Sequence, residues 1–150
     1  MRPTIRDANP FDIPAILGML RQYRAFAPLE FLQEVDDEIY ITQVLTEIMA
    51  GRGIALVAET DKIDGMLLAA ISPSAWSPKH LVMMEMAYWI NVEARGGSAA
   101  HRLIAAYVEH GNALKSQKRI SAFFISKMVN SPDLKYDKFG FKKLEDFWVI

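Results

Sequence analysis

A cation, two glycines and a serine stand together where one apolar segment ends and the next begins. Arg95, Gly96, Gly97 and Ser98 join a run typical of a β-strand to a run typical of an α-helix. Glycine permits a tight turn, and it also lets a ligand approach the backbone closely. Free N–H groups at the start of a helix attract anions, and a neighbouring arginine adds positive charge. We therefore expect a phosphate-bearing ligand at this corner, with a plain tight turn as the alternative.

Several other chemistries are made improbable by what the sequence lacks. It contains no cysteine, which removes disulfides, thiolate metal sites and cysteine nucleophiles. His101 and His110 lie about 180° apart around one helix at its usual rotation per residue and cannot share a metal ion. The glycine-rich motifs of dinucleotide-binding folds and P-loop NTPases are absent, as is the G-x-S-x-G nucleophile motif. We expect no metal site.

The bulk properties are those of one globular domain. The chain has 150 residues, of which 51% are apolar, and this is enough to build a single core. A net charge of -1 gives no general attraction to nucleic acid or to an anionic membrane. The N-terminus has no apolar signal segment, and no later apolar run is long enough to span a bilayer. We expect a cytoplasmic protein without nucleic-acid or membrane partners.

The order of apolar patterns in the first half predicts a strand, two helices and a hairpin. A short strand candidate precedes apolar residues that recur at helical spacing from Ile13 to Tyr23. A second helix is indicated over EVDDEIYITQVLTEIMAGRG, where Gly51 is placed to end it. Residues 53–72 hold two apolar runs around a polar turn, which predicts a β-hairpin.

The second half predicts a central strand followed by alternating helices and strands. In residues 81–92 the even-numbered positions from Met84 onward are all apolar, whereas the odd-numbered ones include Glu85. A helix after the glycine pair, a strand over RISAFFIS, a short helix capped by Ser131 and stopped by Gly140, and a closing strand over FKKLEDFWVI follow. The order β-α-α-β-β-β-α-β-α-β predicts an α/β (α+β) fold with a mixed, mostly antiparallel sheet flanked by helices.

Two segments resemble motifs of the GNAT N-acetyltransferase superfamily. VEARGGSAAHRLI resembles the acyl-CoA loop Q/R-x-x-G-x-G/A, with Arg95 at its first position and Ala100 at its last, and YDKFGF resembles the motif Y-x-K-x-G-F near the C-terminus. The element order fits the family as well. The resemblance implies a single N-acetyltransferase domain over residues 1–150. Such enzymes move an acetyl group from acetyl-CoA to an amine by direct attack in a ternary complex.

The acyl-CoA loop departs from the family pattern at two positions. Ser98 stands where the pattern has its first glycine, and Val92 replaces the proline common just before the arginine. We expect binding to survive, because Gly97 supplies flexibility and the Ser98 hydroxyl adds a donor.

The resemblance also implies which residues bind the donor. The backbone of Ile90, Asn91 and Val92 is expected to pair with the pantetheine amides. The residues implied to hold the pyrophosphate are Arg95, Gly96, Gly97, Ser98, Ala99 and Ala100. Asn130 is implied to bond the pantetheine arm, with a plain turn residue as the alternative.

For catalysis the resemblance implies Tyr136 and Glu85. Tyr136 matches the tyrosine that protonates the departing CoA thiolate in many members; the alternative is a packed aromatic residue. Glu85 lies on the strand where several members carry a general base. An acid among Met83, Ala87 and Trp89 would be desolvated, which raises its pKa toward that of a useful base. A water chain ending on backbone groups is the competing proton acceptor.

Two readings of the function remain open at this point. The first is an acetyl-CoA-dependent N-acetyltransferase acting on an amine acceptor, without a metal. The second is a non-catalytic acyl-CoA-binding or partner-binding module on the same fold. The sequence leaves a homodimer open and does not distinguish small amines from a peptide N-terminus or a lysine.

Overall fold

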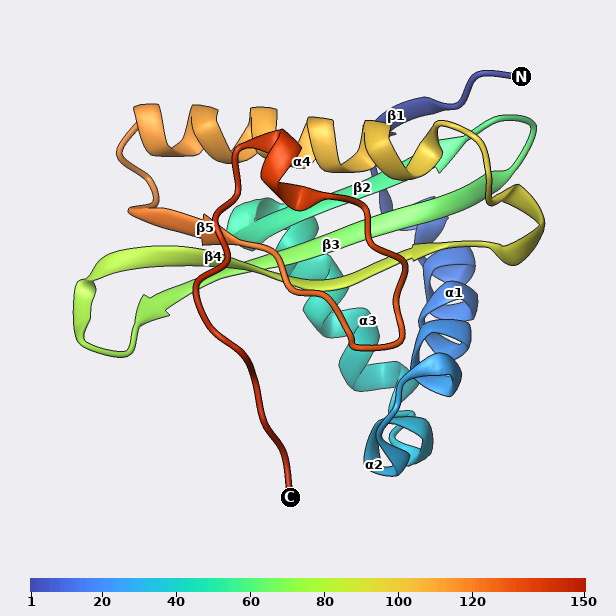
Figure 1. Cartoon of the computed structure of the whole chain (residues 1–150), viewed down its shortest axis with the longest axis horizontal. Helices are drawn as coiled ribbons and strands as arrows, with labels where there is room; N and C mark the ends of the chain where they lie inside the picture. Colours follow the sequence, from blue (N-terminus) through green and yellow to red (C-terminus); the bar gives the residue numbers. More distant parts are fainter.

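A computed structural model describes all residues, 1–150. The chain forms five strands and four α-helices in the order β1-α1-α2-α3-β2-β3-β4-α4-β5 (Figure 1). Their bounds are β1 Thr4–Asp7, α1 Ile13–Phe26, α2 Glu30–Glu34, α3 Glu38–Glu47, β2 Gly53–Glu59, β3 Ile63–Ser74, β4 Ser77–Ile90, α4 Ala99–Ser116 and β5 Ala122–Phe124. None of the helices is both long enough and apolar enough to cross a bilayer.

The strands form one mixed sheet in the order β1-β2-β3-β4-β5. The first four strands pair antiparallel with their neighbours, and β5 pairs parallel with β4. The β2–β3 hairpin lies where the two apolar runs around a polar turn predicted it. The mixed, mostly antiparallel sheet flanked by helices is therefore confirmed.

Helices cover both faces of the sheet. On one face α1 and α3 pack on Val57, Leu68 and other residues of β2, β3 and β4. On the other face α4 lies along the sheet, where Leu103 and Tyr107 are fully buried (Figure 1). This cover explains the continuous apolar runs of β2 and β3, because a strand covered on both faces has no side in water for polar residues.

A β-bulge in β4 changes the predicted pattern of that strand. The pairing moves from Leu68–Ala87 to Ala69–Glu85, which leaves Met86 as the extra residue. Glu85 precedes the bulge and Tyr88 follows it, and both lie on the face of the sheet that α4 covers. The prediction of one apolar face running through all even-numbered positions is therefore wrong, since one extra residue exchanges the two faces.

The C-terminal third differs most from the predicted order. The strand predicted over RISAFFIS is only three residues long, Ala122–Phe124. The short helix is a single 3-10 turn over Tyr136–Phe139, so Ser131 does not cap it, although Gly140 ends it with a φ of 97° as predicted. The closing strand over residues 141–150 is not formed. Beyond Phe124 no residue pairs with a strand, and propensity alone does not order a short element.

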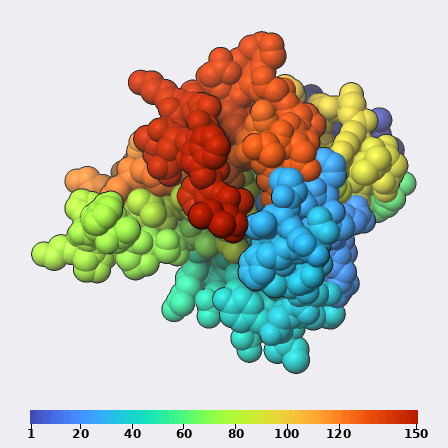
Figure 2. Space-filling model, turned by 60° about the horizontal axis from the view of Figure 1, so that its bottom comes forward, coloured from blue at the N-terminus to red at the C-terminus, as the bar shows by residue number.

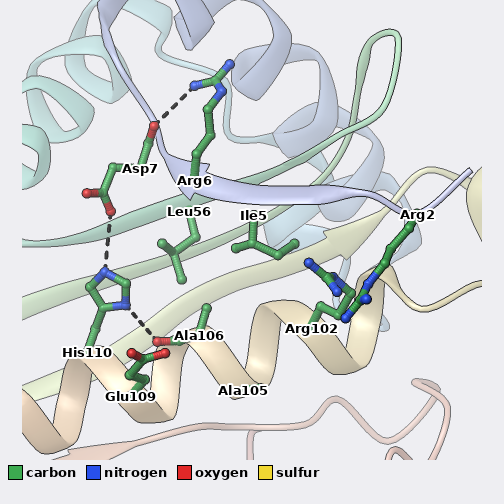
Figure 3. Close-up of a pocket in the computed structure, with 10 residues that line it drawn as sticks. All are labelled: Arg2, Ile5, Arg6, Asp7, Leu56, Arg102, Ala105, Ala106, Glu109 and His110. Carbon is green, nitrogen blue, oxygen red and sulfur yellow. Dashed lines mark hydrogen bonds and ion pairs between the residues drawn. The ribbon is translucent and has the colours of Figure 1, made fainter.

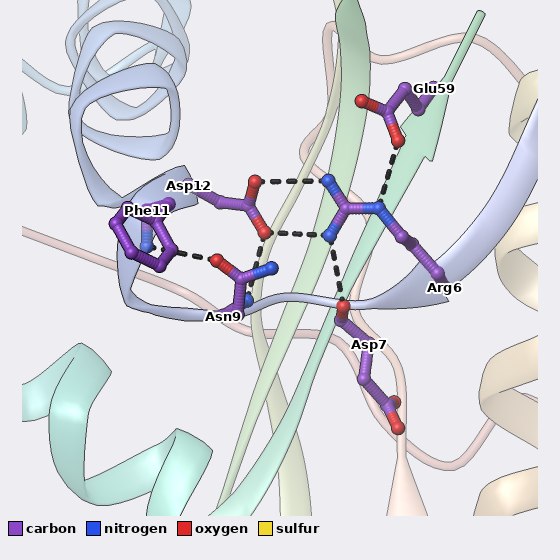
Figure 4. Close-up of polar contacts among 6 residues, drawn as sticks. All are labelled: Arg6, Asp7, Asn9, Phe11, Asp12 and Glu59. Carbon is purple, nitrogen blue, oxygen red and sulfur yellow. Dashed lines mark hydrogen bonds and ion pairs between the residues drawn. The ribbon is translucent and has the colours of Figure 1, made fainter.

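A buried carboxylate fastens β1 to the start of α1. Asp12 is 6% exposed and accepts two bonds from the Arg6 guanidinium, at 2.7 and 3.0 Å (Figure 4). The Nε of Arg6 donates to Glu59 at the end of β2, and the N–H of Asn9 donates to Asp12. Bonding to Arg6 holds the pKa of Asp12 below its usual value.

Replacing Arg6 by leucine tests this fastening. The variant leaves Asp12 buried without its cation, and we expect the free energy of unfolding at neutral pH to fall by about 2 kcal/mol, less than for a fully buried pair because Arg6 is partly exposed. The pKa of Asp12 is depressed in the folded state, so the contribution is present above the ordinary value of 3.8 and disappears below it.

Urea unfolding at neutral and acidic pH measures both effects. Arg2→Leu is the matched control, since Arg2 forms no ion pair. A loss of equal size at both pH values would show that the Arg6–Asp12 charge pair contributes nothing.

Candidate functional site

Strands β4 and β5 pair over a short stretch and then separate. β4 pairs with β3 as far as Ile90, but with β5 only over Val82–Met84. Beyond Phe124 the chain leaves β4 and reaches the end of α1, where Asn130 donates to the Phe26 carbonyl at 2.8 Å (Figure 1). The edge of β4 over residues 85–90 therefore has no strand beside it.

Glu85 lies at the point where the two strands separate. Glu85 is 6% exposed. One of its carboxylate oxygens accepts hydrogen bonds from the N–H of Ser126 at 3.1 Å and from the Ser126 hydroxyl at 3.2 Å. No cation pairs with it. Burial therefore raises the pKa of Glu85 to about 7, against the opposing effect of the two hydrogen bonds.

Four of the five tyrosines surround this carboxylate. Their hydroxyls donate to main-chain carbonyls: Tyr23 to Met86 at 3.4 Å, Tyr88 to Ala100 at 2.7 Å, Tyr107 to Phe124 at 2.7 Å and Tyr136 to Ser126 at 3.5 Å. Burial raises the pKa of all four, and the charge of Glu85 raises each further. The four phenols therefore stay protonated near neutral pH.

Both side chains implied for catalysis form a hydrogen bond with Ser126. Ser126 donates its N–H to Glu85 and accepts a hydrogen bond on its carbonyl from Tyr136. Burial, with the Glu85 charge second, raises the pKa of Tyr136 to about 12. A carboxylate able to accept a proton and a phenol able to donate one thus lie on either side of the Ser126 backbone.

The corner before α4 presents a row of unpaired backbone donors. The N–H groups of residues 96–101 donate to no acceptor in the protein, and the first bond of the helix runs from Arg102 to the Ser98 carbonyl. Gly96 has a φ of 92°, which favours glycine, whereas Ser98 has a φ of -92°. Serine is thus accommodated without strain, and the residue that needs glycine geometry is Gly96 rather than Gly97.

Arg95 and Asn130 are engaged within the protein. The Nε of Arg95 donates to the Ile90 carbonyl at 3.0 Å, and its guanidinium lies 4.5 Å from the Trp89 ring centroid and 5.9 Å from that of Phe26. These contacts are favourable cation–π interactions. Since Asn130 also bonds to Phe26, the roles of both side chains in donor binding stay predictions.

The three strand-end residues implied to pair with the donor differ in orientation. The N–H of Asn91 donates to the Asp64 carbonyl of the neighbouring strand, whereas the Ile90 carbonyl faces the open edge and accepts from Arg95. Val92 begins a 3-10 turn. Ile90 is therefore the best placed of the three for a bond along the free edge.

Sequence reasoning missed four of the residues around Glu85. Tyr23, Tyr88, Tyr107 and Ser126 come from α1, β4, α4 and the segment after β5. Tyr88 was hidden by the bulge, because simple alternation places it on the face opposite Glu85. A tyrosine within an otherwise apolar stripe was the available signal, since a buried hydroxyl needs a polar partner.

A separate hollow lies away from these residues. It has a volume of about 550 Å³ and lies between β1 and α4, at the opposite edge of the sheet from β5 (Figure 3). Arg2 and Arg102 line one end, and Asp7 and His110, 3.6 Å apart, line the other. None of the residues implied for binding or catalysis lines it.

Comparison with solved structures shows which fold this is. The chain is similar to a predicted acetyltransferase with acetyl-CoA from Clostridium acetobutylicum, with a TM-score of 0.71 and 15% identity over 99% of this chain and 95% of the other. It is similar to a transcriptional regulator from Bacillus halodurans C-125, with a TM-score of 0.70 and 19% identity over 99% and 98% of the two chains.

A third similar structure contains sisomicin. This is the aminoglycoside acetyltransferase meta-AAC0020 from an uncultured soil metagenomic sample in complex with sisomicin, with a TM-score of 0.64 and 15% identity over 99% of this chain and 95% of the other. Neither a protein-family model nor a curated protein matches the sequence. At these identities the likeness shows the fold alone, a fold that this chain shares with structures named as acetyltransferases.

Replacing Glu85 by glutamine tests the unusual pKa directly. In the native protein the carboxyl keeps its proton up to about pH 7, whereas in the unfolded chain it ionises near 4.5. The folded state thus binds more protons in this interval, and stability falls as the pH rises through it, by about 3 kcal/mol for a shift of this size. Glu85→Gln removes this slope.

The measurement is the free energy of unfolding of both proteins between pH 4.5 and 8. Glu109→Gln, at an exposed position of α4, is the control. Parallel stability curves for the native protein and Glu85→Gln would mean that burial does not raise the pKa of Glu85.

Proposed function

We propose that this protein is an N-acetyltransferase that moves an acetyl group from acetyl-CoA to a primary amine by direct attack in a ternary complex. The observation that carries the proposal is the buried, cation-free carboxyl of Glu85, bonded to the same residue as the Tyr136 phenol. The fold shared with acetyltransferases, one of them with acetyl-CoA, supports the choice of donor.

The chain offers acetyl-CoA two kinds of backbone contact. The unpaired N–H groups of residues 96–101 suit the negative oxygens of a pyrophosphate, since they point from a helix N-terminus. The unpaired edge of β4 over residues 85–90 suits the amides of pantetheine, which can pair with it as a strand would. Donor binding would therefore leave the thioester near the point where β4 and β5 separate.

The two side chains at that point account for the protons of the reaction. An ammonium acceptor gives one proton to the Glu85 carboxylate, and the freed nitrogen lone pair attacks the thioester carbonyl carbon. As the C–S bond breaks, the Tyr136 hydroxyl gives its proton to the thiolate. The amide nitrogen loses its second proton, which restores Tyr136 through water. Acetylated amine and CoA thiol are the products, and Glu85 returns its proton to solvent.

The raised pKa of Glu85 suits the first of these steps. A carboxylate with an ordinary pKa is too weak a base to take a proton from an ammonium. A pKa of about 7 reduces the difference between the pKa values of the carboxyl and the ammonium, and it still leaves about half of the carboxyl groups ionised at neutral pH.

Release of CoA thiol from acetyl-CoA tests the function. The assay is run against polyamines, aminoglycosides, amino acids and peptides with a free N-terminus or lysine, and the acetylated product is identified by mass. We expect release that depends on one of these amines. Tight acetyl-CoA binding without amine-dependent release would instead indicate a non-catalytic acyl-CoA-binding module.

Tyr136→Phe separates an enzyme from such a module. The change keeps the ring, which packs against Phe141 with centroids 6.3 Å apart, and removes only the proton donor. We expect kcat to fall 10- to 100-fold, the low end for a positioned acid because a thiolate is a good leaving group. Acetyl-CoA affinity and the melting temperature are expected to stay close to native.

Tyr40→Phe is the matched control, because Tyr40 is exposed on α3 and is the only tyrosine away from Glu85. The steady-state rate is measured with the amine that the panel identifies. An unchanged kcat in Tyr136→Phe would remove this residue from the mechanism, and a loss of acetyl-CoA binding with an intact fold would make it a cofactor-positioning residue.

A further inference from the structure

The last seven residues of the chain form an exposed apolar segment. Residues 144–150 read LEDFWVI, and their large side chains lie in water: Phe147 is 96% exposed and Trp148 is 87% exposed. Leu144, Val149 and Ile150 are exposed as well. This C-terminal end lies at the surface in Figure 2. Contiguous exposed apolar residues mark a contact surface.

The pattern of this segment is that of a strand buried on both faces. Phe147 and Val149 would point to one face of a strand, and Trp148 and Ile150 to the other. A strand with one face in water alternates apolar and polar residues, whereas a run of apolar, β-branched and aromatic residues is typical of a strand covered on both sides.

The sheet has a free edge for such a strand at β5. β5 is the last strand in the order, so nothing pairs with its outer edge. The chain also passes close to β5 after the 3-10 turn, because the Phe141 ring lies 5.9 Å from that of Phe123. Even so, residues 142–150 continue past β5 without pairing with it.

Only one face of the sheet is covered at this edge. Phe123 belongs to the core beneath α4. The core on the other face, beneath α1 and α3, contains no residue of β5 or of the chain that follows it. On that face Met84 is 46% exposed, and its neighbour Phe124 is half-buried. A tail that paired with β5 of its own chain would therefore leave half of its apolar residues in water.

We propose that residues 144–150 of one chain pair with the free edge of β5 in a second copy of this chain, and that the exchange is reciprocal. Each copy has one unpaired tail and a free edge at β5, so a two-fold arrangement pairs each tail with the β5 edge of the other copy. The uncovered face around Met84 then lies against the other copy, which supplies the missing cover.

The charges of the two partners are complementary. Residues 144–150 carry Glu145 and Asp146 and no cation, with Asp146 paired to Lys143 just before them, whereas residues 118–127, which contain β5, carry Lys118, Arg119 and Lys127 and no acid. Pairing these segments between two copies brings opposite charges together and like charges apart, which favours this partner over a tail-to-tail contact.

The first test is the molar mass in solution by light scattering at micromolar concentrations. We expect a dimer for the native chain and a monomer for Phe147→Asp/Trp148→Asp, with a cooperative thermal transition in both. The control is Phe31→Asp, which removes an exposed phenylalanine of α2 and is expected to stay dimeric. A monomeric native chain, or a dimer that survives the double change, would overturn the proposal.

A cross-link tests the exchange itself without relying on the stability of a variant. The chain contains no cysteine, so single cysteines can be placed cleanly. Chains with Val149→Cys and size-tagged chains with Ala122→Cys are produced together and treated with a short bismaleimide. We expect a cross-linked pair of one tagged and one untagged chain.

Asp61→Cys, in the turn between β2 and β3, replaces Val149→Cys in the control and is expected to give no such pair. If a chain carrying both Ala122→Cys and Val149→Cys cross-links only within itself, the tail closes on its own β5 and the exchange does not occur.

Discussion

The Glu85 carboxyl is buried without a cation beside it, and the proposed site depends on this burial. Burial of a carboxylate is costly unless hydrogen bonds or opposite charges offset the loss of water. Here the only donors are the N–H and hydroxyl of Ser126, so the group keeps its proton more readily than an exposed glutamate. Four phenols lie around the carboxyl, but their hydroxyls donate to main-chain carbonyls and so do not offset its burial.

Two irregularities of the sheet create this environment. The bulge at Met86 turns Glu85 and Tyr88 to the same side of β4, and the early separation of β5 leaves the β4 edge beyond Met84 unpaired. A regular strand paired along its whole length would offer neither a free edge nor room for a ligand beside the carboxyl. β5 is also the last strand in the order, so its outer edge stays open for another strand.

How far the sequence predicts this arrangement depends on the kind of signal. The hairpin of residues 53–72, the helix after the glycine pair and the mixed sheet follow from apolar spacing, which long elements display clearly. Gly140 was recognisable because a left-handed end requires glycine. Glu85 and Tyr136 were found through resemblance to a family, and in the structure both form a hydrogen bond with Ser126.

Other features leave no local trace in the sequence. A bulge changes the side on which every later residue lies, yet no residue type announces it at Met86. The tail has a strong strand pattern, but whether it pairs depends on a partner edge and on cover for both faces, which are properties of the assembled sheet. Ser126 contributes through its backbone as well as its side chain, and a backbone contact places no demand on residue type.

Hydrogen exchange of the backbone amides in the presence of acetyl-CoA tests most directly whether the parted strands are the donor site. If they are, acetyl-CoA slows exchange at residues 96–101 and along β4 from Glu85 to Ile90, because these N–H groups acquire acceptors or lose access to water. The amides of β1 and of residues 105–110, which border the hollow between β1 and α4, keep their rates. Protection confined to that hollow, with residues 96–101 unchanged, would contradict the account.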